Sequence, residues 1–105
     1  MANIPRVPDD YVVVRGGAKP LPPPGTPFSA AAGRDLDDAA RGIPHGQLRS
    51  TTPGKIRALG GTVEARPEMT KSGVMNDRHV EVIEGIAGAF GDIEPNPVPK
   101  EERIR

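Results

Sequence analysis

The sequence contains no cysteine and no tryptophan among its 105 residues, and only one tyrosine and two phenylalanines. Without cysteine, the chain can form neither a disulfide nor a thiolate metal site, so packing alone must stabilise the fold. The scarcity of aromatic rings disfavours a surface on which the bases of a single-stranded nucleic acid stack. If the protein binds RNA, we therefore expect contacts to the sugar-phosphate backbone, whose affinity falls steeply with salt.

Large apolar side chains are also few. Leu, Ile, Val and Phe together number 22, which is just above the range typical of chains that cannot fold. Glycine and proline together number 26, close to the level of low-complexity sequences. We therefore expect a small ordered centre with irregular arms. Because a core of this size is often completed by a second copy of the chain, a homo-oligomer is an open alternative.

No apolar run approaches the roughly 20 residues that a membrane-spanning helix needs. The sequence also begins without the apolar stretch of a secretory signal peptide. We therefore expect no membrane association and a cytoplasmic location. Export by a route that uses no such signal, or derivation from a longer chain, is the alternative.

Charge is distributed unevenly although the formal net charge is zero. The segment 41–79 contains seven Lys or Arg and three Asp or Glu, a balance of +4. The two flanking segments contain seven basic and eleven acidic residues, a balance of −4. A basic centre favours an anionic ligand, whereas chance scatter in a short chain is the alternative.

Short β-branched or alternating segments bounded by glycine and proline predict strands, and segments that begin with Asp35 and Thr52 as N-caps predict two short helices. The expected strands are residues 11–15, 46–51, 62–66 and 79–83, and the expected helices are residues 35–41 and 53–59. This order predicts an α+β domain with a small mixed or mainly antiparallel sheet of about four strands, and with both helices on one side.

The chain is expected to form one small domain, residues 1–105, with its ordered centre at about 11–84. Residues 16–34 should form an extended proline-rich loop, residues 67–77 a polar loop, and residues 85–105 an extended C-terminal arm. The proline-rich loop contains two PxxP patterns. They are explained by a stiff surface connection or, alternatively, by a proline-recognising protein partner.

The stretch HGQLRSTTPGKIR, residues 45–57, is the strongest candidate for a ligand site. Thr52 as N-cap and Pro53 as first helical residue predict a helix start, where free backbone N–H groups and the positive end of the helix dipole attract phosphate. The alternative is ordinary helix capping without a ligand. The candidate ligand-binding residues are Arg49, Thr51, Thr52, Gly54, Lys55 and Arg57, with Arg78 alongside.

His45 and His79 are candidate catalytic residues, because histidine is the side chain suited to proton transfer near neutral pH. Each begins an expected strand, and each lies near an arginine in the sequence, Arg49 or Arg78. If the two imidazoles converge, one can take the proton of an RNA 2′-hydroxyl and the other can protonate the leaving oxygen. The alternative is two histidines with unrelated local roles.

A metal site is not expected. His79 and Glu81 alternate onto one strand face and could recruit His45, but the sequence has no HExxH motif and no calcium-type acidic cluster. The segment around Lys55 also lacks the GxxxxGK[ST] pattern of a nucleotide-binding P-loop, and we expect no cofactor.

These features together predict a small domain that binds a phosphate-bearing ligand, RNA above all, through its basic centre and a helix N-terminus. Metal-independent RNA cleavage by the two histidines extends this hypothesis. The alternative is a non-catalytic protein-interaction module that uses the proline-rich loop and the C-terminal arm.

Overall fold

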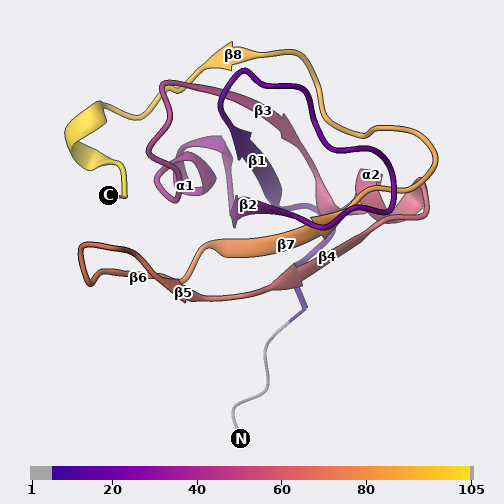
Figure 1. Ribbon diagram of the computed structural model, residues 1–105, viewed down its shortest axis with the longest axis horizontal. Coiled ribbons are helices and arrows are strands. Elements are labelled where there is room, and N and C mark those ends of the chain that lie inside the picture. Colours follow the sequence, from indigo (N-terminus) through magenta and orange to yellow (C-terminus); the bar gives the residue numbers. More distant parts are fainter. Residues whose placement is uncertain (1–5, 105) are drawn as a thin grey trace, which may run out of the picture.

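The structure, a computed structural model, describes residues 6–104 and contains one main sheet, a separate hairpin and short helices (Figure 1). In chain order the elements are β1 (Val12–Gly16), β2 (Phe28–Gly33), α1 (Leu36–Ala40), β3 (Gln47–Thr51), α2 (Pro53–Ala58), β4 (Thr62–Ala65), β5 (Glu68–Met69), β6 (Met75–Asn76), β7 (His79–Ile83), β8 (Glu94–Pro95) and a 3-10 helix at Lys100–Glu102. Within residues 6–104, no helix is long and apolar enough to cross a membrane.

The main sheet has six strands in the order β4-β7-β2-β1-β3-β8, and every neighbouring pair is antiparallel. The expected α+β class is confirmed, although the sheet is larger than the four strands expected. The two N-caps are also confirmed: Asp35 accepts a hydrogen bond from the backbone of Asp38, and Thr52 accepts one from the backbone of Lys55. Side-chain capping therefore identified both helix starts correctly.

Strand β2 lies inside the segment expected to be a proline-rich loop, so that expectation was wrong for its residues. The sequence of β2, FSAAAG, lacks the β-branched residues that favour strands. It is nevertheless central in the sheet, between β1 and β7. Small residues are required here because α1 lies directly on the strand: a Cβ atom at Gly33 would lie 2.4 Å from the backbone nitrogen of Ala39.

The expected polar loop 67–77 is also more ordered than predicted. It forms the hairpin β5-β6, which continues outward from the β4-β7 pair (Figure 1). Each strand of this hairpin is only two residues long, which is too short for an alternating pattern that would predict a strand from the sequence. The hairpin carries three large apolar side chains that are at least half exposed: Met69, Val74 and Met75.

Apolar residues pack on both faces of the sheet, and the helices lie on opposite faces. The expectation that both helices lie on one side was therefore wrong. The α2 face is formed by Val7, Val13, Phe28, Ala30, Ala32, Ile56, Val63, Val80 and Val82. The α1 face is formed by Val14, Ala31, Ala39, Ala40, Ile43, Leu48 and Val98.

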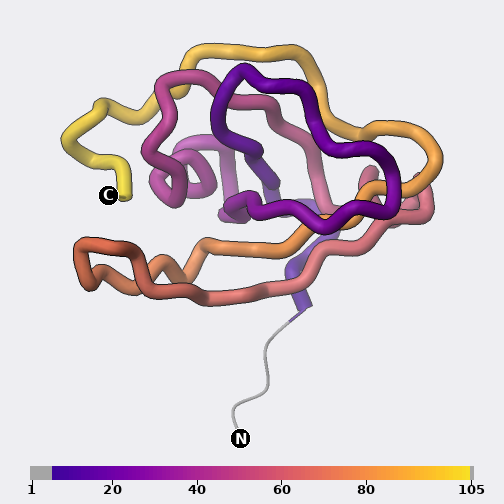
Figure 2. The backbone as a smooth tube through the Cα atoms, in the orientation of Figure 1, coloured from indigo at the N-terminus to yellow at the C-terminus, as the bar shows by residue number. Residues whose placement is uncertain are grey.

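The C-terminal segment contains β8 and the 3-10 helix and is packed against the domain. Figure 2 shows it running along the β3 edge of the sheet, where β8 pairs with β3. Val98 is buried on the α1 face, and the backbone N–H of Ile104 donates to the carbonyl of Arg41. Residues 94–104 thus complete the core on the α1 face.

The contact between α1 and β2 predicts that Gly33→Ala destabilises the protein by about 1–3 kcal/mol, because an added methyl overpacks a site closed by backbone atoms. The matched control is Gly91→Ala, whose Cβ atom would meet no atom closer than 3.5 Å. Urea unfolding of both variants measures the difference. Equal stability of the two variants would contradict this account of β2.

Candidate functional site

A cavity of about 680 Å³ lies beside the main sheet and is the principal candidate site. Its walls come from segments far apart in the sequence: residues 15–19 at the end of β1 and beyond it, residues 42–45 before β3, residues 68–71 of the hairpin, and Ile104 near the C-terminus. His45 and His79 both line it. The volume is within the range of small-molecule and cofactor sites.

His45 lies against the backbone of β1. A Cβ atom at Gly16 would be 2.2 Å from the Nδ1 atom of His45, so the ring occupies the space that a side chain at this position would fill. The loop carrying His45 is fixed by Asn96, which donates a side-chain hydrogen bond to the His45 carbonyl at 2.9 Å. The imidazole itself makes no hydrogen bond within residues 6–104.

His79 is held in a defined orientation. Its Nδ1 atom lies 2.6 Å from the carbonyl oxygen of Arg66, and since a carbonyl only accepts hydrogen bonds, Nδ1 carries the proton. The Nε2 atom is buried and makes no hydrogen bond in the structure. A carboxylate oxygen of Glu68 lies 3.4 Å from Nε2, a contact that is an ion pair only when the imidazole is protonated.

The strand register places His79 and Gly16 on the α1 face of the sheet, and the His45 ring occupies the position of a Cβ atom at Gly16. His79 is opposite Ala31, which is opposite Val14 on β1, and Gly16 lies two positions further along β1. Neighbouring strands are about 4.8 Å apart and alternate residues about 7 Å apart, so the Cα atoms of His79 and Gly16 are separated by roughly 12 Å. Both rings line the cavity, with His45 against β1 and His79 on β7, two strands away.

Two lysines supply positive charge at the cavity. Lys19 follows β1 and Lys71 lies in the β5-β6 turn; both residues are exposed. Neither ammonium group makes a hydrogen bond or ion pair within the part of the chain that the structure describes. Unpaired cations beside proton-transfer groups suit the binding of a phosphate diester.

Comparisons of the chain with protein-family models, with curated proteins and with solved structures find no match. The chemistry of the cavity residues is therefore the basis for inferring function.

The expected ligand residues at the start of α2 lie elsewhere. None of the residues 49–57 lines the cavity. The N-terminal segment closes the helix start, since the backbone N–H of Gly54 donates to the carbonyl of Asp9 and the side chain of Arg57 pairs with the Asp9 carboxylate. Thr51 is buried. With only six residues and with its backbone groups already bonded, α2 is better described as a capped helix.

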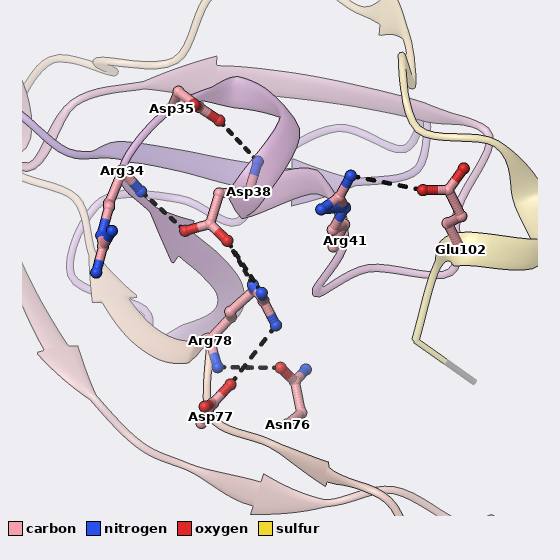
Figure 3. A network of polar contacts seen from close by, with 8 residues as sticks. All are labelled: Arg34, Asp35, Asp38, Arg41, Asn76, Asp77, Arg78 and Glu102. Atoms are coloured by element: carbon pink, nitrogen blue, oxygen red, sulfur yellow. Dashed lines mark hydrogen bonds and ion pairs between the residues drawn. The ribbon is translucent and has the colours of Figure 1, made fainter.

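The two expected arginines are also outside the cavity. Arg49 on β3 is opposite Arg15 on β1, and its buried Nε atom has no hydrogen-bond partner in the structure. Arg78 donates two hydrogen bonds to one oxygen of Asp38, at 3.0 and 3.1 Å (Figure 3). Asp77 also lies 3.6 Å from its guanidinium group, so the positive charge of Arg78 is compensated within the fold.

Arg78 and its neighbours instead hold the site together (Figure 3). The side chain of Asn76 is buried; it donates to the carbonyl of Gly42 at 3.0 Å and accepts from the backbone of Arg78 at 3.1 Å. Gly42 is three residues before His45, and Arg78 is adjacent to His79. One asparagine thus connects the segments that carry the two histidines.

Asp38 is the centre of the polar network in Figure 3. Its pKa is below the ordinary value of 3.8, because the backbone N–H of Arg34 and the guanidinium group of Arg78 both donate to the carboxylate. Burial acts in the opposite direction but is outweighed. A carboxyl whose pKa is lower in the folded state stabilises the fold above its unfolded pKa, and this contribution is lost as the pH falls.

Asp38→Asn is therefore expected to lower the free energy of unfolding by about 1–2 kcal/mol at pH 7, because charge-assisted hydrogen bonds are lost at a partly exposed site. The difference from the wild type should shrink as the pH falls through 3.8. Asp37→Asn is the matched control, since the Asp37 side chain is exposed and makes no hydrogen bond in the structure. Urea unfolding between pH 3 and 7 tests this; a pH-independent difference would contradict it.

Proposed function

We propose that this domain cleaves RNA at a phosphodiester bond held in the cavity between His45 and His79. The observation that supports this most strongly is that the two histidines, 34 positions apart in the sequence, line the same cavity together with two unpaired lysines. The RNA-binding hypothesis drawn from the sequence thereby moves from the α2 turn to the α1 face of the sheet.

The reaction requires a group that removes the 2′-hydroxyl proton and a group that protonates the leaving 5′-oxygen. His45 borders the cavity on one side, and His79 with Glu68 borders it on another. A phosphate between them has a proton-transfer group available for each oxygen. Lys19 and Lys71 stabilise the negative charge that develops on the phosphate oxygens.

The nucleophile defines the substrate class. Because the attacking oxygen belongs to the ribose 2′-hydroxyl, RNA is cleaved and DNA is not. The few aromatic side chains in the chain agree with recognition through phosphate and sugar rather than through base stacking.

Incubating the protein with an oligoribonucleotide and with the DNA of the same sequence tests the reaction. We expect the RNA alone to be cleaved, to 2′,3′-cyclic phosphate and 5′-hydroxyl ends. His45→Ala should lower the rate at least about 100-fold, the usual contribution of general acid-base catalysis. His79→Ala should also lower the rate, because it empties the other side of the cavity. Intact RNA after incubation with the wild type, or equal rates for all three proteins, would refute the proposal.

The lysines are tested by binding to a 2′-O-methyl RNA, which cannot be cleaved. Lys71→Ala and Lys19→Ala should each weaken binding and reduce the slope of log affinity against log salt by about 0.7, the value for one lost contact to a single strand. Lys100→Ala is the matched control, because Lys100 is exposed, unpaired and does not line the cavity. If Lys55→Ala weakens binding and Lys71→Ala does not, the ligand lies at α2 instead.

A further inference from the structure

We propose that Glu68 is the residue that accepts the 2′-hydroxyl proton, and that His79 is a positioning residue that holds the Glu68 carboxylate. This inference rests on the RNA-cleaving function proposed above. It assigns different roles to two residues that lie in contact and adds a catalytic residue to the two histidines.

The exposure of the two side chains decides which of them a substrate meets. The Glu68 side chain is 61% exposed, whereas the His79 side chain is 12% exposed. The Nε2 atom of His79 is buried, with the Glu68 carboxylate 3.4 Å away. A ribose hydroxyl that enters the cavity therefore reaches Glu68 without any rearrangement of His79.

The hydrogen bond from Nδ1 of His79 to the backbone determines when the other ring nitrogen, Nε2, can act as a donor. Because Nδ1 donates to the Arg66 carbonyl, Nε2 can direct a proton toward Glu68 only when the ring carries both protons. In that form the imidazolium cannot accept a further proton. It can only hold the Glu68 carboxylate, an oxygen of which lies 3.4 Å from Nε2.

The backbone around Glu68 is also fixed relative to the rest of the site. In the hairpin, Glu68 on β5 is paired with Asn76 on β6. Asn76 is the buried side chain that donates to the carbonyl of Gly42, on the segment leading to His45. The hairpin thus connects Glu68 to the opposite side of the cavity.

With these roles, the 2′-oxygen attacks phosphorus, its proton passes to the Glu68 carboxylate, and the bond between phosphorus and the 5′-oxygen breaks. Protonated His45 donates its proton to the leaving 5′-oxygen. The products are a 2′,3′-cyclic phosphate and a 5′-hydroxyl, and exchange with water returns the proton from Glu68 to His45. No oxidant or further reactant is needed.

Conservative substitutions distinguish this assignment from proton transfer by His79. Glutamine at position 79 provides an N–H donor that can face Glu68 but cannot carry a catalytic proton. We expect Glu68→Gln to lose at least about 100-fold in kcat on an RNA dinucleotide, and His79→Gln to remain within about tenfold of the wild type. Near-wild-type activity of Glu68→Gln overturns the proposal, and thermal unfolding checks that both variants are folded.

A second substrate, uridine 3′-(4-nitrophenyl phosphate), has a leaving group that needs no protonation. Loss of a general acid is therefore compensated on this substrate, whereas loss of the base is not. We expect Glu68→Gln to be inactive on both substrates and His45→Ala to recover on the activated one. If His79→Gln is inactive on RNA and does not recover on the activated substrate, His79 itself acts on the base side, and the assignment of the base to Glu68 is overturned.

Recovery of His79→Gln on the activated substrate would identify His79 as the acid and overturn the proposal. If the wild type cleaves neither substrate, the proposed function itself fails. The two failures are therefore separate results of one set of assays.

Discussion

The close approach of α1 and the loop that follows it to strand β2 is the constraint on which the rest of the structure depends. A Cβ atom at Gly42 would lie 2.9 Å from the Cβ atom of Ala31 and 3.0 Å from that of Arg78, so only glycine fits there. The chain reaches His45 three residues after Gly42, and His79 is adjacent to Arg78. One packing contact therefore sets the distance between the two sides of the cavity.

Hydrogen bonds reinforce this packing around the segments that carry His45 and His79. Asp38 connects α1 to Arg78, and Asn76 connects the hairpin to the Gly42 carbonyl. The buried side chain of Asn96 does the same for the His45 loop from the C-terminal arm. Buried amide groups with satisfied hydrogen bonds give a fixed geometry at little cost, which a chain without disulfides needs at a site built from distant segments.

The basic side chains form two groups, those paired with carboxylates and those without an ion pair in the described part of the chain. Arg57 of α2 and Arg78, just before β7, are paired with carboxylates and contribute to the fold. Lys19 and Lys71, by contrast, remain unpaired at the cavity. A count of basic residues along the chain could not distinguish these two groups, because pairing depends on which acidic residue lies nearby in space. Four of the seven basic residues of segment 41–79 pair with carboxylates: Arg41, Arg57, Arg66 and Arg78.

The sequence by itself determined the α+β class, the two capped helix starts, and the strands with alternating or β-branched side chains, because these features depend on local propensity and capping. It also identified the two histidines as proton-transfer candidates. Only the tertiary structure decided the rest. Strand β2 has no local strand signal and forms because small residues admit α1, and the hairpin residue Glu68 has no motif that connects it to His79. Convergence of side chains follows from strand order, which short-range patterns do not encode.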